Sequence, residues 1–224
     1  MRGQYTEMES RGGQQESKIL VEGANAMELQ LGPQQIEQLS GFLDLLEHWG
    51  RVHNLVGRQK RAEQIPLHLF DSLAVAPFLN QGVVADLGSG AGLPGVPLAV
   101  LYPESEFDLI EPRQKRCAFL HQVVTELGLN NITITQKRGE SYQPKLKFDT
   151  LVTRALAALP RLFQLAQPLL KPGGVLVAMK GGYPDSEIEA LPLEVQERCR
   201  VSPIAVPGLQ GQRHVAVITI SRSL

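Results

Sequence analysis

The chain has 224 residues, of which 43% are hydrophobic and 20% charged, and its formal net charge at pH 7 is −1. This composition suits one α/β core with an appendage, and the near-neutral charge excludes wholesale affinity for nucleic acid, so any such binding must come from local basic clusters. No apolar run reaches membrane-spanning length and residues 1–28 lack a signal-peptide core, so we expect a cytoplasmic protein without membrane contact. Two cysteines are too few for a disulfide framework or a four-ligand metal site, and no metal is expected.

The first 80 residues are predicted to form a tail and a helical extension. Residues 1–30 are polar, rich in Gly, Gln and Glu, and without sustained periodicity, which predicts a flexible tail. From Pro33 to Trp49, apolar residues recur at helical spacing, and a second helix is predicted over residues 66–78. Residues 31–80 are therefore expected to be a helical extension of the main domain, which we place at residues 81–224.

Two features of this extension have both a structural and a functional interpretation. The segment Arg51–Arg61 holds four Lys or Arg residues and no carboxylate, so it is either a solvated loop or a set of phosphate contacts. His68 and Asp71 lie three residues apart on one helix face. A hydrogen-bonded pair between helices is the favoured interpretation there, and a metal or catalytic pair is the alternative.

The stretch of residues 83–97 has the pattern around which the rest of the chain is organised. Residues 83–87 form a short, β-branched, apolar run, typical of a strand buried on both faces of a parallel sheet. A loop follows that carries Gly88, Gly90, Gly92 and Gly95. Glycines let a ligand approach the backbone, and a helix beginning near Leu93 would direct free N–H groups at it. The stretch therefore predicts a site for a nucleotide-type cofactor.

The loop alone leaves the cofactor open, because Gly90, Gly92 and Gly95 also fit the dinucleotide fingerprint. Two details favour another cofactor. Asp86 stands before the first glycine, where a carboxylate can meet a cationic amino group, and Pro94 removes an N–H group that a diphosphate would use. The acid-x-Gly-x-Gly-x-Gly pattern resembles the S-adenosylmethionine loop of Rossmann-like methyltransferases. An NAD(P)-binding oxidoreductase is the alternative.

The remaining chain alternates predicted strands and helices. Further strands are expected at residues 107–110, 132–135, 148–153 and 175–179, followed by an antiparallel closing pair at 201–206 and 214–221. The fold class is therefore α/β: a doubly wound, mostly parallel, seven-stranded Rossmann-like sheet with an N-terminal helical extension.

Polar residues follow four of the predicted strands, at Asp86, Glu111, residues 138–140 and Arg154. The carboxyl ends of parallel strands share one edge of a sheet, where ligands bind. Glu111 lies about twenty residues past the glycines, where such folds place a carboxylate on the ribose hydroxyls. We therefore expect Asp86, Gly88, Gly90 and Glu111 to bind the cofactor.

These motifs together resemble the ribosomal RNA small subunit methyltransferase G family, also called glucose-inhibited division protein B. The resemblance spans about residues 33–220 and is carried by Trp49 with Asn54-Leu55, His68 with Asp71-Ser72-Leu73, the loop from Asp86 to Gly95, Arg138, Thr153-Arg154-Ala155 and Arg213-His214. It implies methyl transfer from S-adenosylmethionine to N7 of a guanine in the decoding region of 16S rRNA, within the small ribosomal subunit. The cofactor contacts it implies are Gly88, Leu93, Gly139, Glu140 and Arg154. We expect a monomer.

Guanine N7 carries an in-plane lone pair and no proton, so methyl transfer to it needs alignment and charge stabilisation and no general base. Arg138 and Arg154 are the catalytic candidates, because a guanidinium fork can hold guanine O6 or a phosphate. The fourth predicted strand ends in Thr153-Arg154-Ala155 and lacks the Asn/Asp-Pro-Pro-Tyr motif of exocyclic-amine methyltransferases. The alternative functions that remain open are those of a different S-adenosylmethionine-dependent methyltransferase and of a non-catalytic RNA-binding module.

Overall fold

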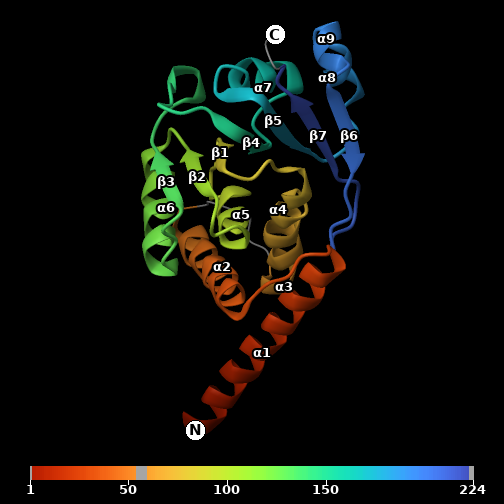
Figure 1. Cartoon of the computed structure of the whole chain (residues 1–224). Coiled ribbons are helices and arrows are strands. Elements are labelled where there is room, and N and C mark those ends of the chain that lie inside the picture. The colour runs from red at the N-terminus through yellow and green to blue at the C-terminus, as the bar shows by residue number, and fades with distance from the viewer. Residues whose placement is uncertain (1, 54–59, 222–224) are drawn as a thin grey trace.

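The computed structural model describes residues 2–53 and 60–221, and the centre of the fold is one seven-stranded sheet (Figure 1). The strands lie in the order β3-β2-β1-β4-β5-β7-β6. β1 to β5 are parallel, and β7 is antiparallel to both β5 and β6. The doubly wound, mostly parallel α/β fold is therefore confirmed. The bounds are β1 (Val83–Leu87), β2 (Glu106–Ile110), β3 (Ile132–Thr135), β4 (Phe148–Arg154), β5 (Leu170–Lys180), β6 (Cys199–Pro203) and β7 (His214–Thr219).

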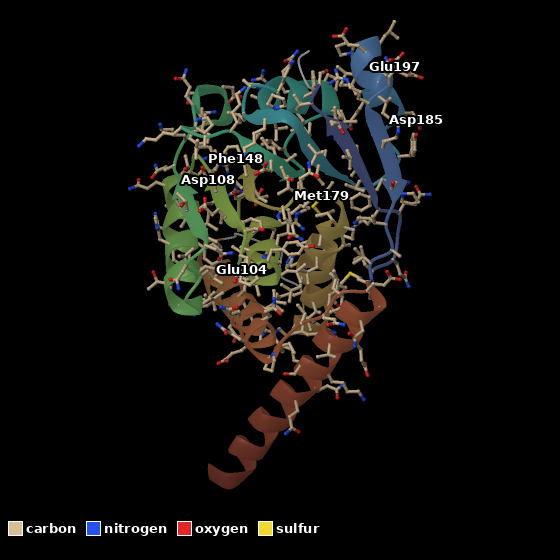
Figure 2. All side chains as sticks on the ribbon, viewed as in Figure 1. Glu104, Asp108, Phe148, Met179, Asp185 and Glu197 are labelled. Carbon is tan, nitrogen blue, oxygen red and sulfur yellow. The ribbon has the colours of Figure 1, made fainter. Side chains whose placement is uncertain are left out.

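The β-branched run of β1 is buried on both faces, as predicted. Val84 belongs to one hydrophobic cluster, while Ala85 and Leu87 belong to the cluster on the opposite face, because successive side chains in a strand alternate. Helices cover both faces: α5 (Gly95–Leu101) and α6 (Gln114–Leu127) supply the first cluster, and α7 (Leu159–Ala166) the second. Figure 2 shows side chains filling the space between these layers. The short α8 (Asp185–Glu189) and α9 (Leu193–Gln196) precede β6.

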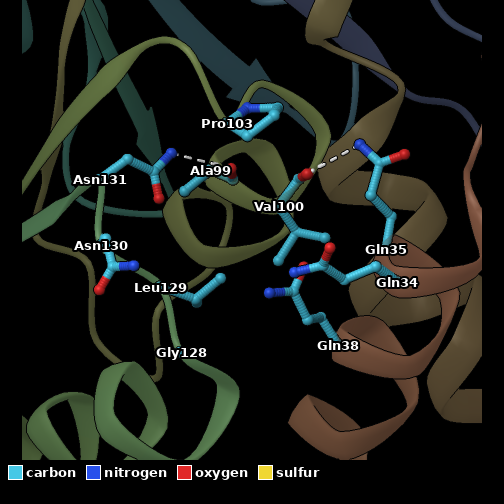
Figure 3. A pocket seen from close by; sticks show the side chains of 10 residues that line it. All are labelled: Gln34, Gln35, Gln38, Ala99, Val100, Pro103, Gly128, Leu129, Asn130 and Asn131. Atoms are coloured by element: carbon cyan, nitrogen blue, oxygen red, sulfur yellow. Dashed lines mark hydrogen bonds between the residues drawn. The ribbon is translucent and has the colours of Figure 1, made fainter.

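The N-terminal extension shares the core of the sheet. α2 (Pro33–His53) buries Leu39, Phe42, Leu43 and Leu46 in the same cluster as α5 and α6. Figure 3 shows a further link, in which Gln35 Nε2 donates to the Val100 carbonyl (2.9 Å) and Asn131 Nδ2 donates to the Ala99 carbonyl (3.0 Å). These amides satisfy carbonyls at the end of α5, which a helix leaves free. They lie near the amino ends of β2 and β3, away from the glycine loop.

The flexible tail predicted over residues 1–30 is wrong, because α1 (Arg2–Ala26) is a helix that extends away from the sheet (Figure 1). Its final turns dock on the body: Leu20 and Ala24 are buried, and a Cβ at Gly23 would stand 2.0 Å from Phe70 Cζ. Ile19 and Met27 also pack against the core, but the docking face spans only about residues 19–27 and is too short to register as a periodicity.

The helix predicted over residues 66–78 is present in broken form. α3 (Arg61–Gln64) runs into a π-helix, η1 (Ile65–Phe70), then α4 (Asp71–Leu73) and a 3₁₀ turn, η2 (Ala76–Phe78). The Asp71 N–H donates to the Pro66 carbonyl five residues earlier. This wider turn lets His68, Leu69, Asp71 and Leu73 all face inward, and all are buried. π-Turns are frequent at functional sites.

Candidate active site

A cavity of about 350 Å³ lies at the carboxyl ends of β1, β2 and β4, and we call it the glycine-loop cavity. Three segments line it: Gly88, Ser89, Gly90, Ala91 and Leu93 after β1; Glu111, Pro112, Arg113 and Arg116 after β2; and Arg154, Ala155 and Leu156 at the end of β4. Of the residues predicted at the carboxyl ends of the strands, the structure brings together Gly88, Gly90, Glu111 and Arg154. Leu93, which the family resemblance implied, lines the same cavity.

Backbone geometry shapes the floor of this cavity. Gly88 and Gly90 have φ values of +76° and +58°, in the left-handed region that favours glycine. The N–H of Gly88 donates to the Ile110 carbonyl (2.9 Å), which ties the loop to β2. A Cβ at Gly90 would stand 3.5 Å from Arg116 Nη1, its nearest neighbour, so a ligand can approach the backbone there. The cradle fits an adenosine-type cofactor.

Glu111 forms one wall, with only 2% of its side chain exposed. Its Oε2 accepts the N–H of Gly90 (3.0 Å) and its Oε1 accepts the N–H of Arg113 (2.8 Å). Arg116 Nη1 lies 3.5 Å from Oε2. Two backbone donors thus fix the carboxylate. Oε2 accepts from both Gly90 and Arg116, so Oε1 is the oxygen that keeps a lone pair for a hydroxyl donor. Its contact with the cofactor ribose stays a prediction.

Asp86 is not in the cavity, which corrects the predicted contact with the cofactor. Its side chain is fully buried, and its Oδ2 accepts the N–H of Gly95 (2.9 Å). Its Oδ1 has no hydrogen-bond partner among the described residues. Burial raises the pKa of Asp86 to about 7, against the opposing effect of the Gly95 hydrogen bond. Asp86 therefore supports the loop from beneath, and α5 begins at Gly95, two residues later than predicted.

The third predicted strand end is not assembled with the others. In the described part of the chain, Arg138, Gly139 and Glu140 line neither this cavity nor the one described next. Arg138 is exposed, and Glu140 Oε1 accepts from Arg161 Nη2 (2.9 Å). A Cβ at Gly139 would stand 2.7 Å from Leu87 Cδ1, so the 3₁₀ turn η3 (Gly139–Ser141) packs closely on the end of β1. The predicted roles of these residues stay predictions.

A second cavity of about 500 Å³ adjoins the first, and we call it the arginine cavity. Its lining comes from five regions: Leu67 and Asp71; Arg154 and Ala155; Met179, Lys180 and Gly181; Ile204; and Arg213 and His214. Met179 is labelled in Figure 2. Three of these side chains are cationic and one, Asp71, is a carboxylate. The arginine cavity is therefore suited to an electron-rich, acceptor-bearing ligand.

Arg154 lines both cavities and stands at their junction. Its side chain is one quarter exposed, and its Nη1 lies 3.3 Å from Asp71 Oδ2 and 3.4 Å from the Leu67 carbonyl oxygen. The next residue, Ala155, has a φ of +52°, which is uncommon for a residue with a Cβ. Such strained positions cluster at active sites. Arg154 is the catalytic candidate that the geometry favours.

Two further cations of the arginine cavity were not singled out as site residues from the sequence. Arg213 Nε donates to Asp71 Oδ1 (3.1 Å), and Lys180 Nζ donates to Glu187 Oε2 (2.6 Å) and to the Ala157 carbonyl (3.2 Å). Arg213 follows a loop and Lys180 ends β5, so neither has a spacing that marks it. The only available signal was the Arg213-His214 pair within the family resemblance.

His68 and Asp71 do not bond to each other. Asp71 pairs with two arginines, while neither ring nitrogen of buried His68 has a hydrogen-bond partner in the described structure. Burial, followed by the charge of Arg154, lowers the pKa of His68 to about 4. Within the described residues no cluster of metal-binding side chains occurs. The favoured interpretation, a hydrogen-bonded pair between helices, is therefore wrong: Asp71 pairs with arginines at the end of β4 and before β7.

The basic segment Arg51–Arg61 is only partly described. Arg61 binds Glu16 (2.8 Å) and Asp44 (2.9 Å), so its charge has partners within the fold, and the hypothesis that the segment contacts phosphate stays a prediction. Lys60 is exposed. Residues 54–59, with Arg58, lie outside the described residues. Across the described chain, no helix combines the length and apolar character needed to cross a bilayer.

The fold and the glycine-loop cavity together define a Rossmann-like methyltransferase domain. Similar folds include a tRNA methyltransferase of Aquifex aeolicus (TM-score 0.53, 16% identity, covering 72% of this chain and 76% of that one). Another is TYW2 of P. horikoshii, solved in complex with MeSAdo (TM-score 0.54, 14% identity, 74% and 65% covered). At these identities the likeness concerns the fold alone.

Sequence relatives identify the family. The model of the family described as rRNA small subunit methyltransferase G matches residues 35–216. The protein of that name in Nitrosococcus oceani is 40% identical over 92% of this chain and 95% of its own length. The one in Stenotrophomonas maltophilia strain K279a is 42% identical over 80% and 84%. The chain belongs to this family of S-adenosylmethionine-dependent methyltransferases.

Proposed function

We propose that this protein transfers a methyl group from S-adenosylmethionine to N7 of a guanine in the decoding region of 16S rRNA, on the small ribosomal subunit. The observation that carries the proposal is that a backbone cradle for a nucleotide cofactor and a cationic cavity share one wall, Arg154. Transfer between two bound molecules requires such a junction, because the reacting atoms must be held in contact and in line.

The glycine-loop cavity would hold the cofactor. Gly88 and Gly90 present backbone, Leu93 and Leu156 present apolar side chains, and Glu111 presents a fixed carboxylate for ribose hydroxyls. When bound there, S-adenosylmethionine supplies an electrophilic methyl group on a sulfonium sulfur.

The arginine cavity would hold the guanine. The N7 and O6 atoms of guanine form one acceptor edge, and a guanidinium can donate to O6 while the N7 lone pair stays free to attack. Because N7 carries no proton, the cavity needs no free base. Among its described lining residues the one carboxylate, Asp71, is engaged by Arg154 and Arg213. The residues present are therefore compatible with N7 as the acceptor atom.

The direct test is incorporation of tritiated methyl groups into small subunits from a strain that lacks the enzyme. We expect incorporation into 16S rRNA and, after borohydride and aniline treatment, strand cleavage at one guanine in the decoding region. Incorporation without cleavage would place the methyl group on another atom. RNA binding without incorporation would support the non-catalytic RNA-binding alternative. Naked 16S rRNA, assayed in parallel, tests whether the assembled subunit is the substrate.

We further propose that the enzyme acts as a cytoplasmic monomer. The glycine-loop cavity and the arginine cavity are each lined by residues of a single chain, which is what a monomeric enzyme requires. Analytical ultracentrifugation at assay concentrations checks the monomer, and fractionation checks the compartment.

A further inference from the structure

Asp71 joins three segments that are far apart in the sequence. It lies at the start of α4, directly after the π-turn η1, and only 6% of its side chain is exposed. Its Oδ2 lies 3.3 Å from Arg154 Nη1, 83 residues away, and its Oδ1 lies 3.1 Å from Arg213 Nε, 142 residues away. One carboxylate therefore ties the N-terminal extension to the end of β4 and to the residue before β7.

The pairing leaves most of each guanidinium available. A guanidinium has five N–H donors, and Asp71 takes one from each arginine. Arg154 also donates to the Leu67 carbonyl, and Arg213 also donates to the Gln212 carbonyl. The pairing with Asp71 orients the N–H donors that remain on each guanidinium. Removing either cation would leave the buried carboxylate less well compensated, which is costly, so the arrangement favours holding all three side chains together.

We propose that Asp71 is a positioning residue, which orients Arg154 and Arg213 toward the methyl acceptor and prevents them from binding RNA phosphates indiscriminately. The proposal rests on the proposed function of the arginine cavity. It also assigns a task to the helical extension: the π-turn brings Asp71 inward, and the Ser72 hydroxyl, which donates to the His68 carbonyl (2.6 Å), holds that turn.

The proposal has a signature that a merely structural residue lacks. Without the carboxylate, two neighbouring guanidinium groups lose their shared anion, repel each other and turn toward solvent. They then gain freedom to contact any phosphate, so general RNA affinity rises and becomes more salt-dependent while methyl transfer slows. A residue needed only for folding would lower RNA affinity, cofactor affinity and turnover together.

The experiment compares Asp71→Asn and Asp71→Glu with the matched control Asp44→Asn, which also removes a carboxylate paired with an arginine but lies outside both cavities. For Asp71→Asn we expect a single-turnover rate on small subunits at least about thirtyfold lower. We expect affinity for S-adenosylhomocysteine within about twofold of wild type, and a log–log salt slope for RNA steeper by about one unit. Asp44→Asn should leave all three unchanged.

Asp71→Glu keeps the charge and moves it by one methylene, so we expect normal RNA salt dependence with turnover at least about tenfold lower. If Asp71→Asn does not fold, the turnover of Asp71→Glu tests the positioning role of Asp71 by itself. Wild-type turnover in Asp71→Glu, or joint loss of cofactor and RNA affinity in a folded Asp71→Asn, would overturn the proposal.

A readout independent of methylation separates this proposal from the proposed function. In NMR spectra, the Arg213 Nε–H should exchange slowly with solvent in wild type and rapidly in Asp71→Asn. If wild type does not methylate small subunits but this difference and the salt slope are found, the proposed function fails while the pairing stands. If Arg213 Nε–H exchanges equally fast in both proteins, the positioning role is contradicted.

Discussion

The two cavities that meet at Arg154 are built in different ways. The glycine-loop cavity takes its walls from residues that directly follow three adjacent parallel strands, and it presents mainly backbone and one carboxylate held by backbone donors. The arginine cavity collects side chains from Leu67 to His214 and depends on ion pairs between distant segments. The first is a property of the fold, and the second is a property of a few side chains. Substitutions should therefore separate cofactor binding from acceptor binding, with Arg154 affecting the chemistry of both.

The largest effect is expected at the junction. Arg154→Ala should lower the single-turnover rate by at least about a hundredfold, because the proposed site would lose the charged donor at the junction of its two cavities. Arg154→Lys should recover little, since lysine keeps the charge but loses the planar fork. Affinity for S-adenosylhomocysteine, measured by calorimetry, should change much less than the rate.

Arg200→Ala is the control for Arg154, because Arg200 is an exposed arginine on β6 that lies outside both cavities. Wild-type turnover in Arg154→Lys would show that only charge matters. Wild-type turnover in Arg154→Ala would make Arg154 a surface residue.

The next effect concerns the arginine cavity alone. Arg213→Ala should lower kcat/KM for small subunits by about ten- to a hundredfold, because it removes a guanidinium that lines the proposed guanine cavity and leaves Asp71 with one partner. Affinity for S-adenosylhomocysteine should match wild type. Arg200→Ala, on β6, is the control. Weakened cofactor binding in Arg213→Ala would show that the two cavities are not separate sites.

The glycine-loop cavity should give the reverse pattern. Glu111→Gln offers one acceptor oxygen in place of two, so Gly90 N–H or Arg113 N–H loses its partner and the ribose loses a charged acceptor. We expect affinity for S-adenosylhomocysteine to fall about tenfold, with RNA affinity unchanged. Glu106→Gln changes an exposed carboxylate at the opposite end of β2 and should have no effect. Equal cofactor affinity in Glu111→Gln and wild type would remove Glu111 from the site.

The smallest effect on binding is expected at Asp86. Because it lies beneath the loop, Asp86→Asn should keep affinity for S-adenosylhomocysteine within about threefold, with the amide oxygen accepting the Gly95 N–H. A loss of affinity beyond about tenfold in the folded variant would restore Asp86 to the cofactor contacts.

Asp86→Asn should instead change how stability depends on pH. The pKa of Asp86 is raised from 3.8 to about 7 in the fold, so its contribution is fully present below about pH 4 and is lost as pH rises through 7. Between these limits the loss approaches about 1.4 kcal/mol per pH unit. His68, whose pKa is lowered to about 4, acts in the opposite sense in both proteins and cancels in the comparison. Urea unfolding from pH 5 to 8 should therefore show a smaller loss for Asp86→Asn; parallel curves would contradict the raised pKa.

The difference between the cavities also explains what could be predicted from the sequence. β1 and its glycine loop were predicted because a buried strand and a tight turn are encoded by adjacent residues. Glu111 was predicted because the spacing between successive strand ends is narrow in such folds. The placement of Asp86 was not, since the same residue before the loop can point at the ligand or into the core.

Long-range pairs left no local signal. The Asp71–Arg213 pair spans 142 residues, and nothing near either residue marks the other. Arg61 belonged to a run of basic residues, yet its partner Glu16 lies 45 residues earlier, in a helix whose docking face was too short to detect. The charge of a sequence segment therefore says little about which of its residues have ion-pair partners within the fold.

The most direct test of the two-cavity account is a crystal structure of the protein with S-adenosylhomocysteine. We expect density against Gly88, Gly90, Glu111 and Leu156, with the arginine cavity of Lys180 and Arg213 left open for the acceptor. Density for the ligand among Asp71, Lys180 and Arg213 would contradict the assignment of the two cavities.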